Sequence, residues 1–164
     1  MAGRLARLGV PDAQRIGAGL AEVAWWSPNL LDEVGAAADP GQVLRVTLEL
    51  AEADPRGISA VAADPRSWRR FVLTTGVSVA LSDHLVRHPE HLAILFEDTQ
   101  PPGPQEIREH MVGVVTGLGA GAADALRVAH RAAVLRIAIA DIPHDAPFEL
   151  TSLRLSELAD AILE

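Results

Sequence analysis

The sequence predicts an all-α protein, a single domain of residues 1–164 that forms a bundle of about six to eight helices with no sheet. Apolar residues recur at intervals of three and four, the period at which side chains share one face of an α-helix. Residues able to cap a helix also stand directly before prolines, which are tolerated at a first helical position because their missing N–H has no partner there. These pairs mark helix starts: Ser27-Pro28, Asp39-Pro40, Asp54-Pro55, Asp64-Pro65 and His88-Pro89.

Helical spacing is clear in the first half of the chain. Apolar residues of 13–24 share one face, and those of 43–51 form a broad face opposite charged residues. The stretch 68–85 is rich in β-branched residues that would also suit a strand. Leu81 and Leu85 nevertheless continue an i, i+4 ridge with no hairpin turn between, so we predict a helix there.

A proline-rich segment divides the chain. Three prolines within residues 99–104 fix φ and remove hydrogen-bond donors, so we predict a loop that separates subregions 1–98 and 105–164. Beyond it, one helix is expected to end at the glycines of 117–121, and a longer helix to run over residues 123–141. Apolar residues on two opposed sides of that longer helix predict that it is the central element of the fold.

Composition excludes several classes of function. The chain has no cysteine, which removes disulfides and thiolate metal sites and makes the reducing cytoplasm the expected location. No apolar run approaches the roughly 20 residues that a membrane span requires. The net charge of -8 disfavours a nucleic-acid partner. Every cation is an arginine, so lysine Schiff bases and the P-loop lysine are excluded.

Three histidines form one candidate metal site. His84, His88 and His91 are spaced i, i+4 and i+7, which on an unbroken helix would place three imidazoles near one face. Pro89 interrupts such a helix. We therefore predict that His88 caps a helix, that the other two rings lie on the surface, and that no metal binds here.

Three further patterns resemble catalytic motifs but have simpler interpretations. Ser82-Asp83-His84 has the residue types of a hydrolase triad, yet neighbours on a helix point about 100° apart and cannot converge. The glycines of 117–121 lack the preceding strand of a phosphate loop and predict a turn between helices. Glu52-Ala53-Asp54 has the carboxylate spacing of a two-metal site, but its position before Pro55 favours capping. We predict no catalytic, cofactor-binding or metal-binding residue in this chain.

Two arginine clusters are candidates for contact with a partner or with another domain. Arg127 and Arg131 form an i, i+4 ridge on the long helix, and Arg66, Arg69 and Arg70 form the second cluster. In a chain this acidic, such clusters are commonly solvated ion-pair faces, so both interpretations remain open.

Two stretches together resemble one enzyme family. Residues 78–90 read Ser-Val-Ala-Leu-Ser-Asp-His-Leu-Val-Arg-His-Pro-Glu and resemble a segment near the start of bacterial glutamine synthetase adenylyltransferase. Residues 126–141, followed by Leu-Ser-Glu-Leu-Ala-Asp-Ala at 155–161, resemble a second pattern of that family. Leu-Ala-Arg-Leu-Gly at 5–9 and the arginine-only, alanine-rich composition are similar to actinobacterial members.

The resemblance implies the non-catalytic N-terminal helical portion of a bifunctional enzyme of nitrogen metabolism. That enzyme attaches AMP to a tyrosine of glutamine synthetase and removes it by phosphorolysis, with ATP and magnesium. Its nucleotidyltransferase domain, with an Asp-x-Asp metal motif, is expected downstream, and the helical pattern that reaches Glu164 without a glycine or proline terminator also predicts a longer chain. The expected partners are that domain, glutamine synthetase and a nitrogen-signalling regulatory protein.

Two alternatives to this interpretation remain. The chain would be a freestanding helical interaction module without enzymatic activity if its gene ended at this point. It would be a small hydrolase if a carboxylate lay within hydrogen-bond reach of the ring of His84 or His110.

Overall fold

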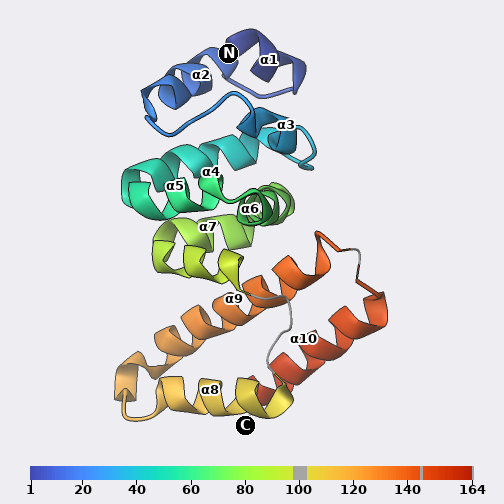
Figure 1. Ribbon diagram of the computed structural model, residues 1–164. Coiled ribbons are helices and arrows are strands. Elements are labelled where there is room, and N and C mark those ends of the chain that lie inside the picture. Colours follow the sequence, from blue (N-terminus) through green and yellow to red (C-terminus); the bar gives the residue numbers. More distant parts are fainter. Residues whose placement is uncertain (98–102, 145, 164) are drawn as a thin grey trace. The chain divides into compact units, whose positions relative to one another are not determined.

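The structure is a computed structural model that describes residues 1–97, 103–144 and 146–163. These residues form helices and no strand, which confirms the predicted all-α class (Figure 1). The chain divides into two compact units, Met1–Phe96 and Glu97–Glu164. Of the predicted loop, residues 99–102 lie outside the described residues. Pro104 is not part of a loop but the first residue of a helix, a position where its missing N–H costs nothing.

The first unit contains α1 (Ala2–Arg7), α2 (Ala13–Glu22), α3 (Leu30–Val34), α4 (Pro40–Ala53), α5 (Pro55–Ala63), α6 (Pro65–Val77), α7 (Val79–Arg87) and the 3-10 helix η1 (Pro89–Phe96). The second contains α8 (Pro104–Val115), the 3-10 helix η2 (Gly119–Gly121), α9 (Ala122–Asp141) and α10 (Phe148–Leu163). The helices among the described residues outnumber those predicted. One reason is that α1 and α3, of 6 and 5 residues, are too short to show an i, i+3, i+4 repeat.

Aspartate caps begin three consecutive helices, as the sequence predicts. The side chains of Asp39, Asp54 and Asp64 accept hydrogen bonds from the backbone N–H three residues later, with N–O distances of 2.9, 3.0 and 2.8 Å. Helices α4, α5 and α6 start at the prolines that follow. The other two pairs act differently, because α3 starts two residues after Pro28 and Pro89 starts the 3-10 helix η1.

The stretch 68–85 is helical, as predicted, but it is divided between two helices. Ser78 adopts an extended conformation, with φ -131° and ψ 103°, and separates α6 from α7. Its hydroxyl oxygen accepts a hydrogen bond from the backbone N–H of Leu81 at 3.2 Å. A serine between two valines therefore acts as an N-cap, which periodicity alone does not reveal.

Helix α4 is the central element of the first unit, since it contacts α2, α3, α5, α6 and α7. Its side chains Val43, Leu44, Val46 and Leu50 are fully buried. Trp68 and Phe71 of α6 stack in the same core with ring centroids 5.3 Å apart. Helix α2 contacts α4, and Figure 1 shows it next to that helix at the N-terminal end of the unit.

The second unit is built from α8, α9 and α10, each of which contacts the other two. Its core contains the buried residues Ile107, Met111, Ala129, Ile137, Leu158 and Ala161. The long helix is present with the predicted bounds to within one residue. Its predicted place at the centre of the whole fold is wrong, because it belongs to the second unit, whereas α4 occupies the centre of the first.

Candidate functional site

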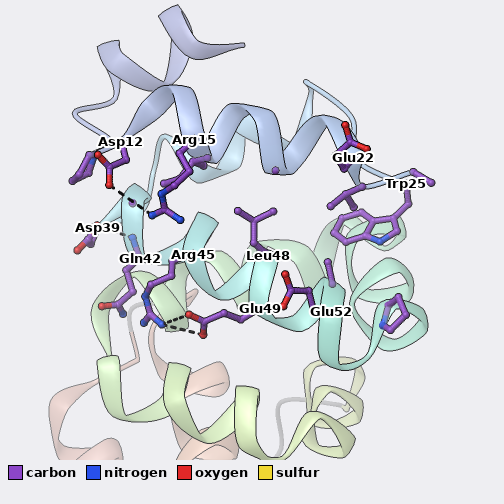
Figure 2. A pocket seen from close by; sticks show the side chains of 18 residues that line it. Asp12, Arg15, Glu22, Trp25, Asp39, Gln42, Arg45, Leu48, Glu49 and Glu52 are labelled. Carbon is purple, nitrogen blue, oxygen red and sulfur yellow. Dashed lines mark hydrogen bonds and ion pairs between the residues drawn. The ribbon is translucent and has the colours of Figure 1, made fainter.

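A groove of about 950 Å³ lies between α2 and α4 of the first unit (Figure 2). Its apolar lining includes Ile16, Val23, Leu48 and Ala51. Gly19 lets the two helices approach here, since a Cβ atom at this position would lie 3.2 Å from both terminal methyl groups of Leu48. An apolar hollow of this size with a few polar groups is typical of a binding site.

Charged residues on the rim of the groove pair with one another at one end. Arg15 lies 3.7 Å from Asp12, the residue before α2, and the Arg45 guanidinium donates to the Glu49 carboxylate at 2.8 Å. Figure 2 shows both pairs as dashed lines. The charges of these two pairs cancel, and the Asp39 carboxylate at this end accepts the Gln42 N–H as the cap of α4.

At the opposite end, two carboxylates have no hydrogen bond or ion pair with any described residue. Glu22 and Glu52 line the groove near the C-terminal ends of α2 and α4, on the side where Trp25 lies (Figure 2). Within residues 1–96, all of which the structure describes, every other carboxylate takes part in a hydrogen bond or ion pair. This end of the groove is therefore acidic.

A row of aromatic rings connects this acidic end to the core. Trp25 and Trp26 meet edge to face with ring centroids 6.2 Å apart, and Trp26 meets Trp68 in the same manner at 6.1 Å. The Trp68 indole N–H donates to the backbone oxygen of Leu30 at 3.3 Å. Trp25 is half-buried and is thus held beside Glu22 and Glu52 by packing that begins in the core.

The first arginine cluster does not form one surface. Arg70 is only 1% exposed, and its Nη1 donates to the backbone oxygen of Leu95 at 2.8 Å. Arg69 is exposed and lies 3.4 Å from Glu33, and Arg66 is exposed. Positions 66 and 69 therefore remain candidates for a partner contact, whereas Arg70 holds η1 against α6.

The second cluster, Arg127 and Arg131, is exposed on α9. Arg127 forms an ion pair with Asp124 one turn earlier, and both side chains are open to solvent. Burial, together with the charge of Arg131, lowers the pKa of the neighbouring His130. The cluster remains a prediction of a partner surface.

The three histidines are closer together than the sequence predicts. Nε2 of His84 lies 2.8 Å from Nδ1 of His91, and the three ring centroids are 4.9 to 5.8 Å apart. The prediction that His84 lies on the surface is wrong, since its exposed fraction is 6%. The chain turns at His88, the C-cap of α7, and η1 packs back on that helix. Among the described residues, no group of three or more His, Asp or Glu side chains is arranged to hold a metal ion.

The remaining motif residues serve the local structure. The Ser82 hydroxyl donates to the backbone oxygen of Thr75 at 3.1 Å, and Asp83 lies 3.7 Å from Arg87. Both groups are thus engaged by partners other than the ring of His84. Gly117 and Gly119 have φ of +79° and +53° and form the predicted turn between α8 and α9.

The hydrolase alternative lacks its required geometry at His110. This exposed ring borders a hollow of about 420 Å³ in the second unit, where Arg136 forms a bidentate ion pair with Glu97 at 2.8 and 2.9 Å. Among the described residues, no carboxylate is hydrogen-bonded to the His110 ring.

Sequence comparison decides the family. Residues 68–164 match the profile of glutamate-ammonia ligase adenylyltransferase. The chain belongs to this family. The stretches that carry the resemblance, 78–90 and 126–141 with 155–161, lie within the matched range.

Bifunctional glutamine synthetase adenylyltransferase/adenylyl-removing enzymes of actinobacteria are similar to this member of the family over nearly its full length. The protein from Cutibacterium acnes is 32% identical over 97% of this chain, that from Leifsonia xyli 33% over 98%, and that from Streptomyces coelicolor 35% over 98%. The chain spans only 17 to 18% of the length of these curated relatives. No solved structure matches it significantly.

The groove of this family member was not foreseen from its sequence. It lies outside the profile match of 68–164, within the part that only the relatives cover. Two signals pointed to it: a glycine inside the α2 pattern, and glutamates near the C-terminal ends of both helices, where acids are unfavourable. In the part of the chain that the structure describes, no helix is long and apolar enough to cross a membrane.

Proposed function

We propose that this chain is a helical, non-catalytic region of a glutamine synthetase adenylyltransferase and adenylyl-removing enzyme, and that its role there is to bind other protein surfaces. Family membership supports the parent enzyme, and the apolar groove between α2 and α4 supports the binding role. The polar groups of the candidate motifs are used for caps and for packing instead of meeting at one point.

The parent activity would be transfer of AMP from ATP to glutamine synthetase and phosphorolytic removal of that AMP, with magnesium as the metal. The described residues do not fit a magnesium site, because Asp54 caps α5 and no cluster of three carboxylates or imidazoles is arranged around an ion. We therefore assign no step of phosphoryl transfer to this chain. The nucleotide and the metal would be held by a nucleotidyltransferase domain downstream in the enzyme.

The proposed partners are that domain, glutamine synthetase and a nitrogen-signalling regulatory protein, all in the cytoplasm. A chain without cysteine and with a net charge of -8 suits a reducing compartment and protein partners. The groove between α2 and α4 is the surface with the clearest chemistry for such contacts.

One assay tests the absence of catalytic groups. The 164-residue chain is incubated with ATP, magnesium and glutamine synthetase, and transfer of labelled AMP is followed. The reverse assay uses adenylylated glutamine synthetase with phosphate. Neither reaction should exceed the rate without the chain. Turnover that persists across independent preparations would contradict the non-catalytic role.

A second assay tests the binding role in the complete enzyme. Ala51→Glu places a charge on the half-buried apolar lining of the groove, while Ala60→Glu, at an exposed position of α5 outside the groove, is the matched control. The groove variant should lower kcat/KM for glutamine synthetase on the order of tenfold at unchanged helix content. Equal rates for the two variants would contradict the role of the groove.

A further inference from the structure

We propose that the groove between α2 and α4 binds a helical protein segment that has an apolar stripe and ends in arginine or lysine, with the basic end seated between Glu22 and Glu52. The inference deepens the proposed binding role and rests on it. It specifies the chemistry of the segment and the direction in which it lies.

The apolar part of the groove fits one face of a helix. The lining residues of α4 extend from Gly41 to Glu52, a length of about 16.5 Å at 1.5 Å per residue. Leu48 projects into the groove from α4 (Figure 2), and Ile16 of α2 and Ala51 of α4 add to the apolar lining. About three turns of a partner helix would cover this surface, with apolar side chains at i, i+3, i+4 and i+7.

The charges of the rim select a basic segment and fix its direction. At one end the arginines are already paired, Arg15 with Asp12 and Arg45 with Glu49. At the other end Glu22 and Glu52 have no partner in the described part of the chain. The first end also carries Asp39, whose carboxylate accepts the Gln42 N–H as the cap of α4, whereas both carboxylates of the second end are unused in the described part of the chain. The cation of the segment therefore belongs at the second end.

Folding of the two helices does not account for these glutamates. The backbone carbonyls at a helix C-terminus carry partial negative charge, so cations stabilise this end and carboxylates oppose it. Glu22 is the last residue of α2, Glu52 is the penultimate residue of α4, and neither helix has a basic residue in its last turn. A guanidinium or ammonium between them would offset both carboxylates and both helix ends.

Trp25 adds a surface on which such a cation can lie. The ring lines the same end of the groove and is held by its contact with Trp26. Cations are attracted to the face of an indole, and arginine stacks on it most often. An anionic segment gains nothing from this arrangement and is repelled by the two carboxylates.

Binding is tested with labelled peptides of a defined pattern. The first peptide has leucines at i, i+3, i+4 and i+7 on an alanine background and two arginines at its C-terminus. The second has glutamates in place of the arginines, and the third has serines in place of the leucines. Fluorescence anisotropy with the 164-residue chain should show saturable binding of the first peptide alone.

Variants of the chain test the position of the cation. Glu22→Gln together with Glu52→Gln should weaken binding of the arginine peptide about five- to tenfold. Glu149→Gln together with Asp160→Gln removes the same charge from exposed positions of α10 and should leave binding unchanged. In two-dimensional NMR spectra, the indole N–H of Trp25 should shift on binding and that of Trp68 should not.

The outcomes separate this inference from the function on which it rests. Binding of the arginine and glutamate peptides with equal affinity, or equal weakening by the two pairs of variants, would overturn the basic end. Absence of saturable binding by any peptide would overturn the helical occupant. The AMP-transfer assays and the Ala51→Glu variant of the complete enzyme decide the proposed function independently of these results.

Discussion

Replacement of Ile137 by alanine is the sharpest test of the second unit. Ile137 is 5% exposed and belongs to the core cluster with Ile107, Met111 and Leu158. The change removes three carbon atoms from a site that the sequence predicts to be buried and the structure places between three helices.

The expected loss follows from two contributions. Withdrawing three buried carbon atoms costs about 2.4 kcal/mol at about 0.8 kcal/mol each. The cavity adds up to about 2 kcal/mol where the surrounding side chains do not close it. Ala129 and Ala161 line the same cluster and are too short to fill the space. Ile137→Ala should therefore reduce the free energy of unfolding of this unit by about 3 to 4 kcal/mol.

The assay must report on the second unit, and tryptophan fluorescence does not. Trp25, Trp26 and Trp68 all lie in the first unit. Urea unfolding is therefore followed by far-UV circular dichroism, and the protection of α9 amides is measured by hydrogen exchange. Arg127→Ala is the control on the same helix, because both this side chain and its ion-pair partner Asp124 are exposed. It should change the free energy of unfolding by less than about 0.5 kcal/mol.

Two results would refute the reasoning. Equal protection of α9 amides in the Ile137→Ala variant and the wild type would show that this side chain is not part of a packed core. A larger loss at Arg127 than at Ile137 would show that the buried and exposed faces of α9 are reversed.

Three further predictions concern caps, titration and glycines. Hydrogen bonds from the hydroxyl and the amide of Ser67 lower the pKa of Asp64 below its ordinary value of 3.8. The stability that the Asp64 carboxylate contributes is therefore fully present above pH 3.8 and is lost as the pH falls through the lower pKa of the folded state. Urea unfolding should show that Asp64→Asn reduces stability at neutral pH and that the difference from wild type shrinks on acidification; a difference independent of pH would contradict the cap. Burial and the charge of Arg131 lower the pKa of His130. In an NMR titration of the Arg131→Gln variant this pKa should rise but stay below 6.5, because burial still lowers it. An unchanged pKa would show that Arg131 is not one of the causes. Gly76→Ala should destabilise the first unit by about 1 to 3 kcal/mol in fluorescence-detected unfolding, because the new Cβ would lie 2.8 Å from Cβ of Ala37. Gly19→Ala should change the free energy of unfolding by no more than about 1 kcal/mol, because only the flexible end of Leu48 is near. Similar losses for the two variants would contradict this description of the packing.

The sequence by itself determined the fold class, the family and the starts of α4, α5 and α6. These features depend on neighbours in the chain, because a cap bonds an amide three residues later and a helical face repeats every three to four residues. Asp39, Asp54 and Asp64 could therefore be assigned from their prolines alone. The family could be recognised because 78–90 and 126–161 occur in the family's order.

Only the tertiary structure decided which polar groups are buried and where a surface is hollow. Arg70 and His84 look like surface residues in the sequence, yet both are covered when η1 packs on α6 and α7. The groove likewise depends on α2 and α4, which are separated in the sequence by the turns around α3 and pack together with Gly19 facing Leu48. Sequence periodicity predicts which face of each helix is apolar, but not which other helix covers that face. That choice depends on contacts between residues far apart in the chain. The same contacts bring Glu22, Trp25 and Glu52 to one end of the groove.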